Sequence, residues 1–253
     1  KIFNYAKKKK VIIFSSPFDE SAVDLLENLS CPAYKIASPE INHIPLIKKV
    51  AKTKKPIILS SGLATLPDLN LAIKTIKSIG NNKIILLKCT SEYPTPFSDV
   101  NLLTMANFTK KFNVVPGISD HTLGLSVPIA SIPLGCKLIE KHFCLENQKS
   151  SVDKFFSLNE YEFETLIKEI RNTEKAIGTV DYNIAKSAKK NINGKRSIYF
   201  CASIKKDQII TTKDIKIVRP AYGLEPIFID KILGKKARKN FDLGDRVYLN
   251  CVK

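Results

Sequence analysis

Short apolar runs alternate with amphipathic segments over roughly the first 180 residues, at intervals of about 25 residues. The amphipathic segments have helical spacing, as in Leu69, Ile73 and Ile76. This alternation is typical of βα units that build a parallel sheet. It predicts six strands, at residues 11–16, 33–38, 56–61, 84–90, 115–119 and 137–143.

The pattern changes towards the carboxyl end. A long helix is predicted over residues 159–177, because Phe163, Leu166 and Ile170 share one face and Gly178 follows. Residues 181–194 are polar and are typical of a linker. We therefore predict a barrel domain over 1–180, the linker over 181–194 and a small β-rich domain over 195–253. Within the small domain we expect β segments at 197–201, 215–218 and 246–249, and a short helix at 228–233.

Six strands do not close a β/α barrel, which needs eight. The chain starts at Lys1 and contains a single methionine. We therefore expect about two further βα units upstream of it. The predicted fold is α/β, a (β/α)8 TIM barrel lacking about its first two βα units, followed by the small β-rich domain. We also expect this stretch of chain to be inactive alone.

Two of the three histidines lie at the ends of neighbouring predicted strands, at His121 and His142. Imidazole suits divalent transition metals, and the carboxyl ends of parallel strands converge where such enzymes do their chemistry. A single histidine is more often a strand cap that bonds to nearby backbone. Because two histidines occupy matching positions, the sequence predicts a two-histidine metal site.

Small hydroxyl residues end most of the other predicted strands. Several hydroxyls and one ammonium at a barrel mouth form a suitable cradle for phosphate. Lys35 supplies the ammonium, and its apolar surroundings make a lysine costly unless its charge is used. A Schiff base is the alternative role for Lys35. The strand-end residues are Ser16, Ser38, Ser60, Thr90, Ser91, Ser119 and Glu140.

Composition argues against several classes of protein. The net charge of +17 comes almost entirely from lysine, with arginine at only five positions. Nucleic-acid readers usually need arginine forks and stacked aromatic residues, so we expect no nucleic-acid partner. The six cysteines form no CxxC pair, and no apolar run is long enough to span a bilayer. We expect reduced thiols, no membrane segment and a cytoplasmic location.

The strand-end motifs resemble those of the sialic-acid synthase (NeuB-like) family, and the carboxyl-terminal part is similar to the family's SAF (antifreeze-like) domain. Within the family, SSVDKFFSL at 150–158 and the RPAYGLEP segment are most similar to the branch that makes pseudaminic acid. The motifs are FSSPF (14–18), AYKIASPE (33–40), PIILSSG (56–62), KCTSEYPTPF (88–97), GISDHTLG (117–124), IEKHF (139–143) and RSIYFCASIKKDQIITTKDIKIVRPAYGLEP (196–226).

The resemblance implies condensation of phosphoenolpyruvate with an amino sugar, and a role for each site residue. His121 and His142 would hold a divalent metal, Mn2+ with Mg2+ or Co2+ as alternatives, and Glu140 would support them. Ser91 is included among the substrate-binding residues, although many family members have asparagine at its position. The residues implied to bind phosphoenolpyruvate are Lys35, Ser16, Ser38, Ser60 and Ser119, and those implied to contact the sugar or intermediate are Glu40, Tyr93 and Asp153.

The resemblance also implies a homodimer in which the SAF domain is swapped onto the partner barrel. Arg219 would then meet the acyl group of the sugar in the partner's site. Two alternatives stay open. The chain is a synthase for N-acetylneuraminate or legionaminate, or it is a non-catalytic fragment or sugar-binding protein that keeps the fold.

Overall fold

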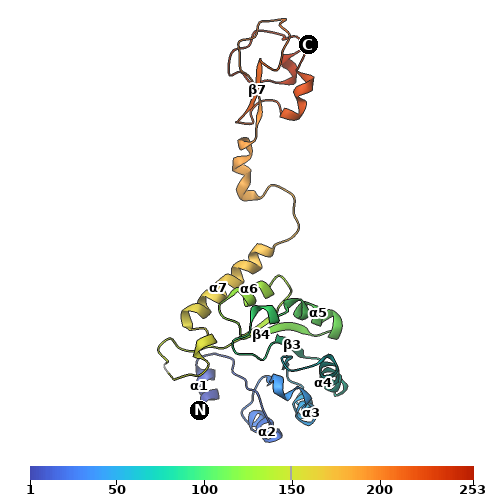
Figure 1. Cartoon of the computed structure of the whole chain (residues 1–253), viewed down its shortest axis with the longest axis vertical. Helices are drawn as coiled ribbons and strands as arrows, with labels where there is room; N and C mark the ends of the chain where they lie inside the picture. Colours follow the sequence, from blue (N-terminus) through green and yellow to red (C-terminus); the bar gives the residue numbers. More distant parts are fainter. Residues whose placement is uncertain (149) are drawn as a thin grey trace. The chain divides into compact units, whose positions relative to one another are not determined.

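The structure is a computed structural model that describes residues 1–148 and 150–253. The chain divides into two compact units, Lys1–Thr179 and Val180–Lys253 (Figure 1). Each unit has its own hydrophobic core. Among the described residues, no helix is both long enough and apolar enough to cross a membrane.

The first unit is built on a five-stranded parallel sheet. The strands follow each other in chain order, so each pairs with the next. Every residue of the first two strands is buried, as expected for parallel strands covered on both faces. The strands are β1 (Tyr34–Ile36), β2 (Ile57–Ser60), β3 (Ile84–Cys89), β4 (Val115–Asp120) and β5 (Leu138–Lys141).

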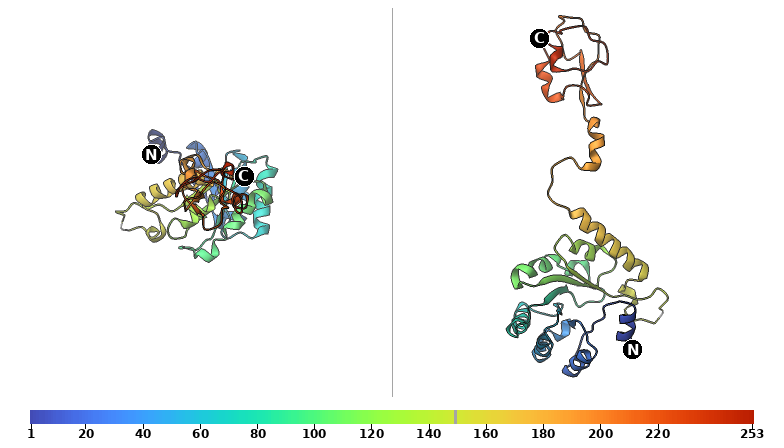
Figure 2. Two further views of the ribbon diagram at one scale, coloured as in Figure 1. Left: turned by 90° about the horizontal axis from the view of Figure 1, so that it is seen from above. Right: turned by 180° about the vertical axis from the view of Figure 1, so that it is seen from behind.

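Helices between the strands form an arc along one side of the sheet (Figures 1 and 2). Their sequences specify where they begin: a capping box of Thr65 and Asp68 starts α4, and one of Asn159 and Glu162 starts α7. The helices are α1 (Ile2–Lys8), α2 (Glu20–Asn28), α3 (Ile44–Lys52), α4 (Leu66–Ser78), α5 (Leu102–Phe112), α6 (Ser126–Ser131) and α7 (Glu160–Ile177), with 3-10 turns η1 (Ser38–Asn42), η2 (Phe97–Asp99) and η3 (Lys154–Phe156).

The prediction of a strand at residues 11–16 is wrong. Only Ser15 makes a parallel bridge there, to Tyr34. Val11 and Ile12 are 61% and 81% exposed, so the apolar run that suggested a buried strand has no core to enter. This run has a neighbouring strand on one side only, and its side chains find little to pack against. It therefore does not form a hydrogen-bonded strand ladder. The other five strand predictions and the helix at 159–177 are confirmed to within a few residues.

The second unit contains a two-stranded antiparallel sheet, β6 (Ser197–Phe200) and β7 (Ile215–Val218), with 3-10 turns η4 (Lys186–Gly194), η5 (Pro226–Lys231) and η6 (Leu249–Cys251). The prediction of a strand at 246–249 is wrong, because Arg246 makes only a single bridge to Tyr199. Val247 is the one buried residue of that run, too little to anchor a strand. The residues predicted as a linker include η4, whose residues are all exposed.

Candidate active site at the strand ends

An ion pair joins the first and last strands of the sheet. The ammonium of Lys35, in β1, lies 3.1 Å from a carboxylate oxygen of Glu140, in β5. These strands stand at opposite ends of the strand order, so the sheet must curl to bring them together. The contact defines the interior of a half-barrel, and Ser119 donates a 2.6 Å hydrogen bond to the same carboxylate.

Hydroxyl groups gather beside this pair. Within the described residues, the buried hydroxyl oxygens of Ser60 and Ser91 have no hydrogen-bond partner. Ser38 accepts a 2.6 Å hydrogen bond from the backbone of Leu63. A Cβ added at Gly62 would lie 2.3 Å from the Ser91 oxygen and 2.9 Å from that of Ser38, so the glycine leaves room for the hydroxyls to converge. Buried hydroxyls without partners are costly, and they are suited to a polar ligand.

Ser16 borders an open cleft next to the ion pair of Lys35 and Glu140. Phe14, Phe18, Lys35 and Glu140 line the same cleft of about 440 Å³. Of the predicted phosphate-binding residues, Ser16 and Lys35 therefore border one cleft, and Ser119 is linked to it through Glu140.

The two predicted metal ligands are side by side. The imidazole centroids of His121 and His142 are 5.2 Å apart, and each histidine directly follows a strand, β4 or β5. Nδ1 of His121 lies 3.0 Å from the carbonyl oxygen of Thr90. Because a carbonyl only accepts, the imidazole donates this bond and its Nε2 keeps a lone pair for a ligand. Nδ1 of His142 lies 3.4 Å from a carboxylate oxygen of Asp153.

The surroundings of His121 favour neutral imidazole, the form that binds metals. Burial lowers the pKa of His121, and the neighbouring His142 acts in the same direction. Among the described residues, no group of three His, Cys, Asp or Glu side chains is arranged to hold a metal ion. The two imidazoles are donors of a kind that divalent transition metals accept, and an ion held by them would need its remaining ligands from substrate or water.

Aromatic rings form a wall next to the histidines. The Tyr93 ring centroid is 4.3 Å from that of His121, and the Phe156 centroid is 4.9 Å from that of His142. Tyr93 is half exposed, and burial of its remaining surface raises its pKa. A ligand beside the imidazoles would therefore meet an apolar face and a protonated phenol.

The remaining predicted site residues are Glu40 and Arg219. Glu40 lies in η1 just after β1, half-buried, and within the described residues no hydrogen bond or ion pair of its carboxylate is found. Arg219 directly follows β7 in the second unit, where its side chain is exposed.

Sequence reasoning missed three buried residues at the strand ends. The Cys89 sulfur lies 4.0 Å from Nδ1 of His121, and burial raises the pKa of this thiol. Asp120 and Lys141 form a buried ion pair one residue before each histidine. Lys141 carried a signal, because it lies inside the strand predicted at 137–143, where a charged residue is unusual, and Asp120 directly follows the strand predicted at 115–119.

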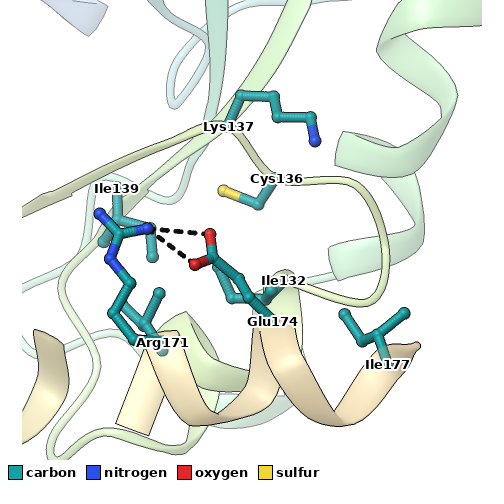
Figure 3. Close-up of a pocket in the computed structure, with 8 residues that line it drawn as sticks. Ile132, Cys136, Lys137, Ile139, Arg171, Glu174 and Ile177 are labelled. Atoms are coloured by element: carbon teal, nitrogen blue, oxygen red, sulfur yellow. Dashed lines mark hydrogen bonds and ion pairs between the residues drawn. The ribbon is translucent and has the colours of Figure 1, made fainter. Parts of the chain in front are cut away.

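A separate groove lies at the other end of β5 (Figure 3). It is lined by Ile132, Cys136, Lys137 and Ile139, and by Arg171 and Glu174, which form a 2.8 Å ion pair on α7. The amino-terminal face of such a barrel serves stability rather than chemistry.

Comparison with known proteins agrees with this geometry. The NeuB family model matches residues 1–182. The chain belongs to the NeuB family. A SAF domain model matches residues 195–252. The predicted fold, a TIM-barrel synthase domain followed by a SAF domain, is confirmed.

Curated relatives in the family include two pseudaminic acid synthases. The Helicobacter pylori enzyme is 43% identical over 239 residues, covering 94% of this chain and 70% of the relative. The enzyme of Campylobacter jejuni serotype O:23/36 is 40% identical, covering 96% and 71%. An N,N'-diacetyllegionaminic acid synthase of Campylobacter jejuni is 39% identical, covering 94% and 72%.

The family fold is also found among solved structures. Spore coat polysaccharide biosynthesis protein spsE of Bacillus subtilis matches with a TM-score of 0.67 and 32% identity, covering 100% of this chain and 76% of that one. N-acetylneuraminic acid synthetase of Leptospira borgpetersenii matches with a TM-score of 0.68 and 28% identity, covering 74% and 65%.

Proposed function

We propose that this protein is a pseudaminic acid synthase, which condenses phosphoenolpyruvate with a diacetamido-trideoxyaltrose and water to give pseudaminic acid and phosphate. The observation that carries the proposal is the combination at the strand ends: Lys35 with buried hydroxyls that have no hydrogen-bond partner among the described residues, and two adjacent imidazoles. The first part suits a phosphorylated acid, and the second suits a metal-assisted carbonyl. The pseudaminic acid synthases among the relatives support the choice of sugar.

In this proposal the barrel residues bind and orient the two substrates. Lys35 places its charge against the phosphate or carboxylate of phosphoenolpyruvate, and Glu140 holds the ammonium in place. Ser16, Ser38, Ser60, Ser91 and Ser119 contribute hydroxyls to the same region.

The sugar would lie on the other side of the site. Tyr93 and Asp153 border the histidines and would contact the sugar, and Glu40 would approach it from η1. A divalent cation held by His121 and His142, Mn2+ with Mg2+ or Co2+ as alternatives, would polarise the sugar aldehyde and orient it.

The reaction forms one carbon–carbon bond and breaks one carbon–oxygen bond. C3 of phosphoenolpyruvate attacks the aldehyde carbon, and the aldehyde oxygen takes up a proton. Water adds at C2, and phosphate leaves with the bridging oxygen as the C2 ketone forms.

We also propose a homodimer in which the SAF domain of each protomer covers the barrel of its partner. Arg219 is exposed on the SAF domain, where its guanidinium can reach a planar oxygen acceptor such as the acyl group of the sugar. Arg219→Lys should raise KM for the sugar and leave KM for phosphoenolpyruvate unchanged. Equal effects on both would contradict this role.

The test of the reaction type uses phosphoenolpyruvate with an isotopically labelled bridging oxygen. If the proposal is right, phosphate release requires the sugar and a divalent metal, and the label appears in phosphate. Label retained in the sugar product, or phosphate release that does not need the sugar, would contradict it.

A further inference from the structure

A fully buried ion pair bridges β4 and β5 one residue before each histidine. The ammonium of Lys141 lies 2.7 Å from a carboxylate oxygen of Asp120, and their side chains are 0% and 1% exposed. The two residues are direct partners in the parallel register of β4 and β5. Burying two charges costs desolvation free energy, which can exceed what their attraction returns. A buried ion pair therefore indicates a role other than stabilising the fold.

The pair lies on the opposite face of the sheet from the site. Side chains alternate between the two faces along a strand. Ser119 and Glu140, the preceding partners in the register, bond to each other at the site. The pair of Asp120 and Lys141 therefore faces away from the site, and the next residues, His121 and His142, return to it. Among the described residues, the pair makes no hydrogen bond to either histidine ring, and its hydrogen bonds hold the backbone beside His121.

The same pair also binds the turn after β4. Asp120 accepts a 3.0 Å hydrogen bond from the backbone nitrogen of Thr122, and Lys141 donates to the carbonyl oxygen of Thr122. Thr122 is completely buried. His121 stands between these two anchored residues, and its own carbonyl accepts a 3.0 Å hydrogen bond from Thr95.

We propose that Asp120 and Lys141 are positioning residues that fix the register of β4 against β5 and the turn at Thr122, and so hold the two imidazoles side by side. Slippage by one residue would move one histidine to the other face of the sheet. The slip would separate Asp120 from Lys141 and leave two buried charges unpaired. The ion pair therefore raises the free energy of the slipped register relative to the native one. This inference rests on the proposed role of His121 and His142 as metal ligands.

The experiment measures Mn2+ binding by the whole protein with calorimetry, and the absorption spectrum of bound Co2+. Asp120→Asn and the apolar double variant Asp120→Leu/Lys141→Met are compared with the unchanged protein, at temperatures where circular dichroism shows each to be folded. Replacing both charges by apolar side chains removes the penalty of an unpaired charge, so the double variant should recover thermal stability. We expect both variants to raise Kd for Mn2+ by about 10- to 100-fold and to change the Co2+ spectrum.

Two control variants keep the possible outcomes distinct. Ile73→Ala removes core packing in α4 and should lower stability while leaving Mn2+ binding and the Co2+ spectrum unchanged. An unchanged Kd and spectrum in the double variant would overturn the positioning role, and so would an equal loss of binding in Ile73→Ala. His121→Ala tests the premise separately: if it binds Mn2+ like the unchanged protein, the metal site of the proposed function is itself wrong.

Discussion

Replacement of Lys35 by methionine should weaken phosphoenolpyruvate binding far more than it weakens the fold. The lysine side chain is 11% exposed and its ammonium lies 3.1 Å from Glu140. Methionine keeps an unbranched apolar stem and removes only the charge and its hydrogen bonds. A hydrogen bond to a charged group contributes about 1.5–3 kcal/mol. Its loss should raise Kd for phosphoenolpyruvate about 10- to 150-fold.

The cost to stability should be much smaller. Glu140 would lose its cationic partner, but its side chain is 35% exposed and still accepts a hydrogen bond from Ser119. Water screening reduces the penalty of the unpaired carboxylate to about 1 kcal/mol. For a chain of this length that corresponds to a fall in Tm of about 2–4 °C.

The assay is steady-state kinetics with each substrate varied, together with calorimetric titration of phosphoenolpyruvate. Lys49→Met is the matched control. Lys49 lies on α3, and its ammonium forms an ion pair at 2.6 Å with a carboxylate oxygen of Asp24. It should change neither KM. An unchanged KM for phosphoenolpyruvate in Lys35→Met would refute the phosphate role of Lys35, and a covalent adduct trapped by borohydride would indicate a Schiff base instead.

Three further predictions concern the histidines, the hydroxyls and acid stability. His121→Ala and His142→Ala should each lose bound Mn2+ and activity, and stoichiometric metal in both variants would contradict the assignment. Ser60→Ala should raise KM for phosphoenolpyruvate without loss of stability, because its hydroxyl has no partner within the described residues. Ser131→Ala loses a 2.6 Å hydrogen bond to the carbonyl oxygen of Pro128. It should lower Tm and leave KM for phosphoenolpyruvate unchanged. Burial would raise the pKa of Glu27, but hydrogen bonds from Lys55 and Tyr34 outweigh it and hold the pKa below its usual 4.5. A carboxyl whose pKa is lower in the folded than in the unfolded chain stabilises the fold at pH values above its unfolded pKa. This stabilisation is lost as the pH falls through the folded pKa. Glu27→Gln lacks the titrating carboxyl, so its Tm should fall less steeply below about pH 4.5.

The strands that sequence predicted correctly are fully buried in β1 and β2, mostly buried in β3 and β4, and half-buried in β5. The apolar runs that became β2 and β3 enter the core, and the two strands are parallel neighbours, as the βα repeat predicts. The runs at 11–16 and 246–249 have similar composition but little burial in the structure. Composition does not reveal whether a run finds a neighbour on both sides, so these two predictions failed.

The site was predictable in its residue types and not in its pairings. Alternation placed Ser119, Glu140 and both histidines at strand ends, and the structure brings them together. The contact of Lys35 with Glu140 depends on the curl of the whole sheet, which no local pattern contains. The partnership of Asp120 with Lys141 depends on the register between two strands that are far apart in sequence.

The choice of sugar is the central claim, and a competition experiment tests it most directly. The full-length enzyme is given phosphoenolpyruvate, Mn2+ and equal amounts of the amino-sugar precursors of pseudaminic, legionaminic and N-acetylneuraminic acids, and the products are quantified by mass spectrometry at early times. Product ratios report the ratio of kcat/KM values directly. We predict that pseudaminic acid predominates. Predominance of either of the other acids, or formation of none, would contradict the proposed function.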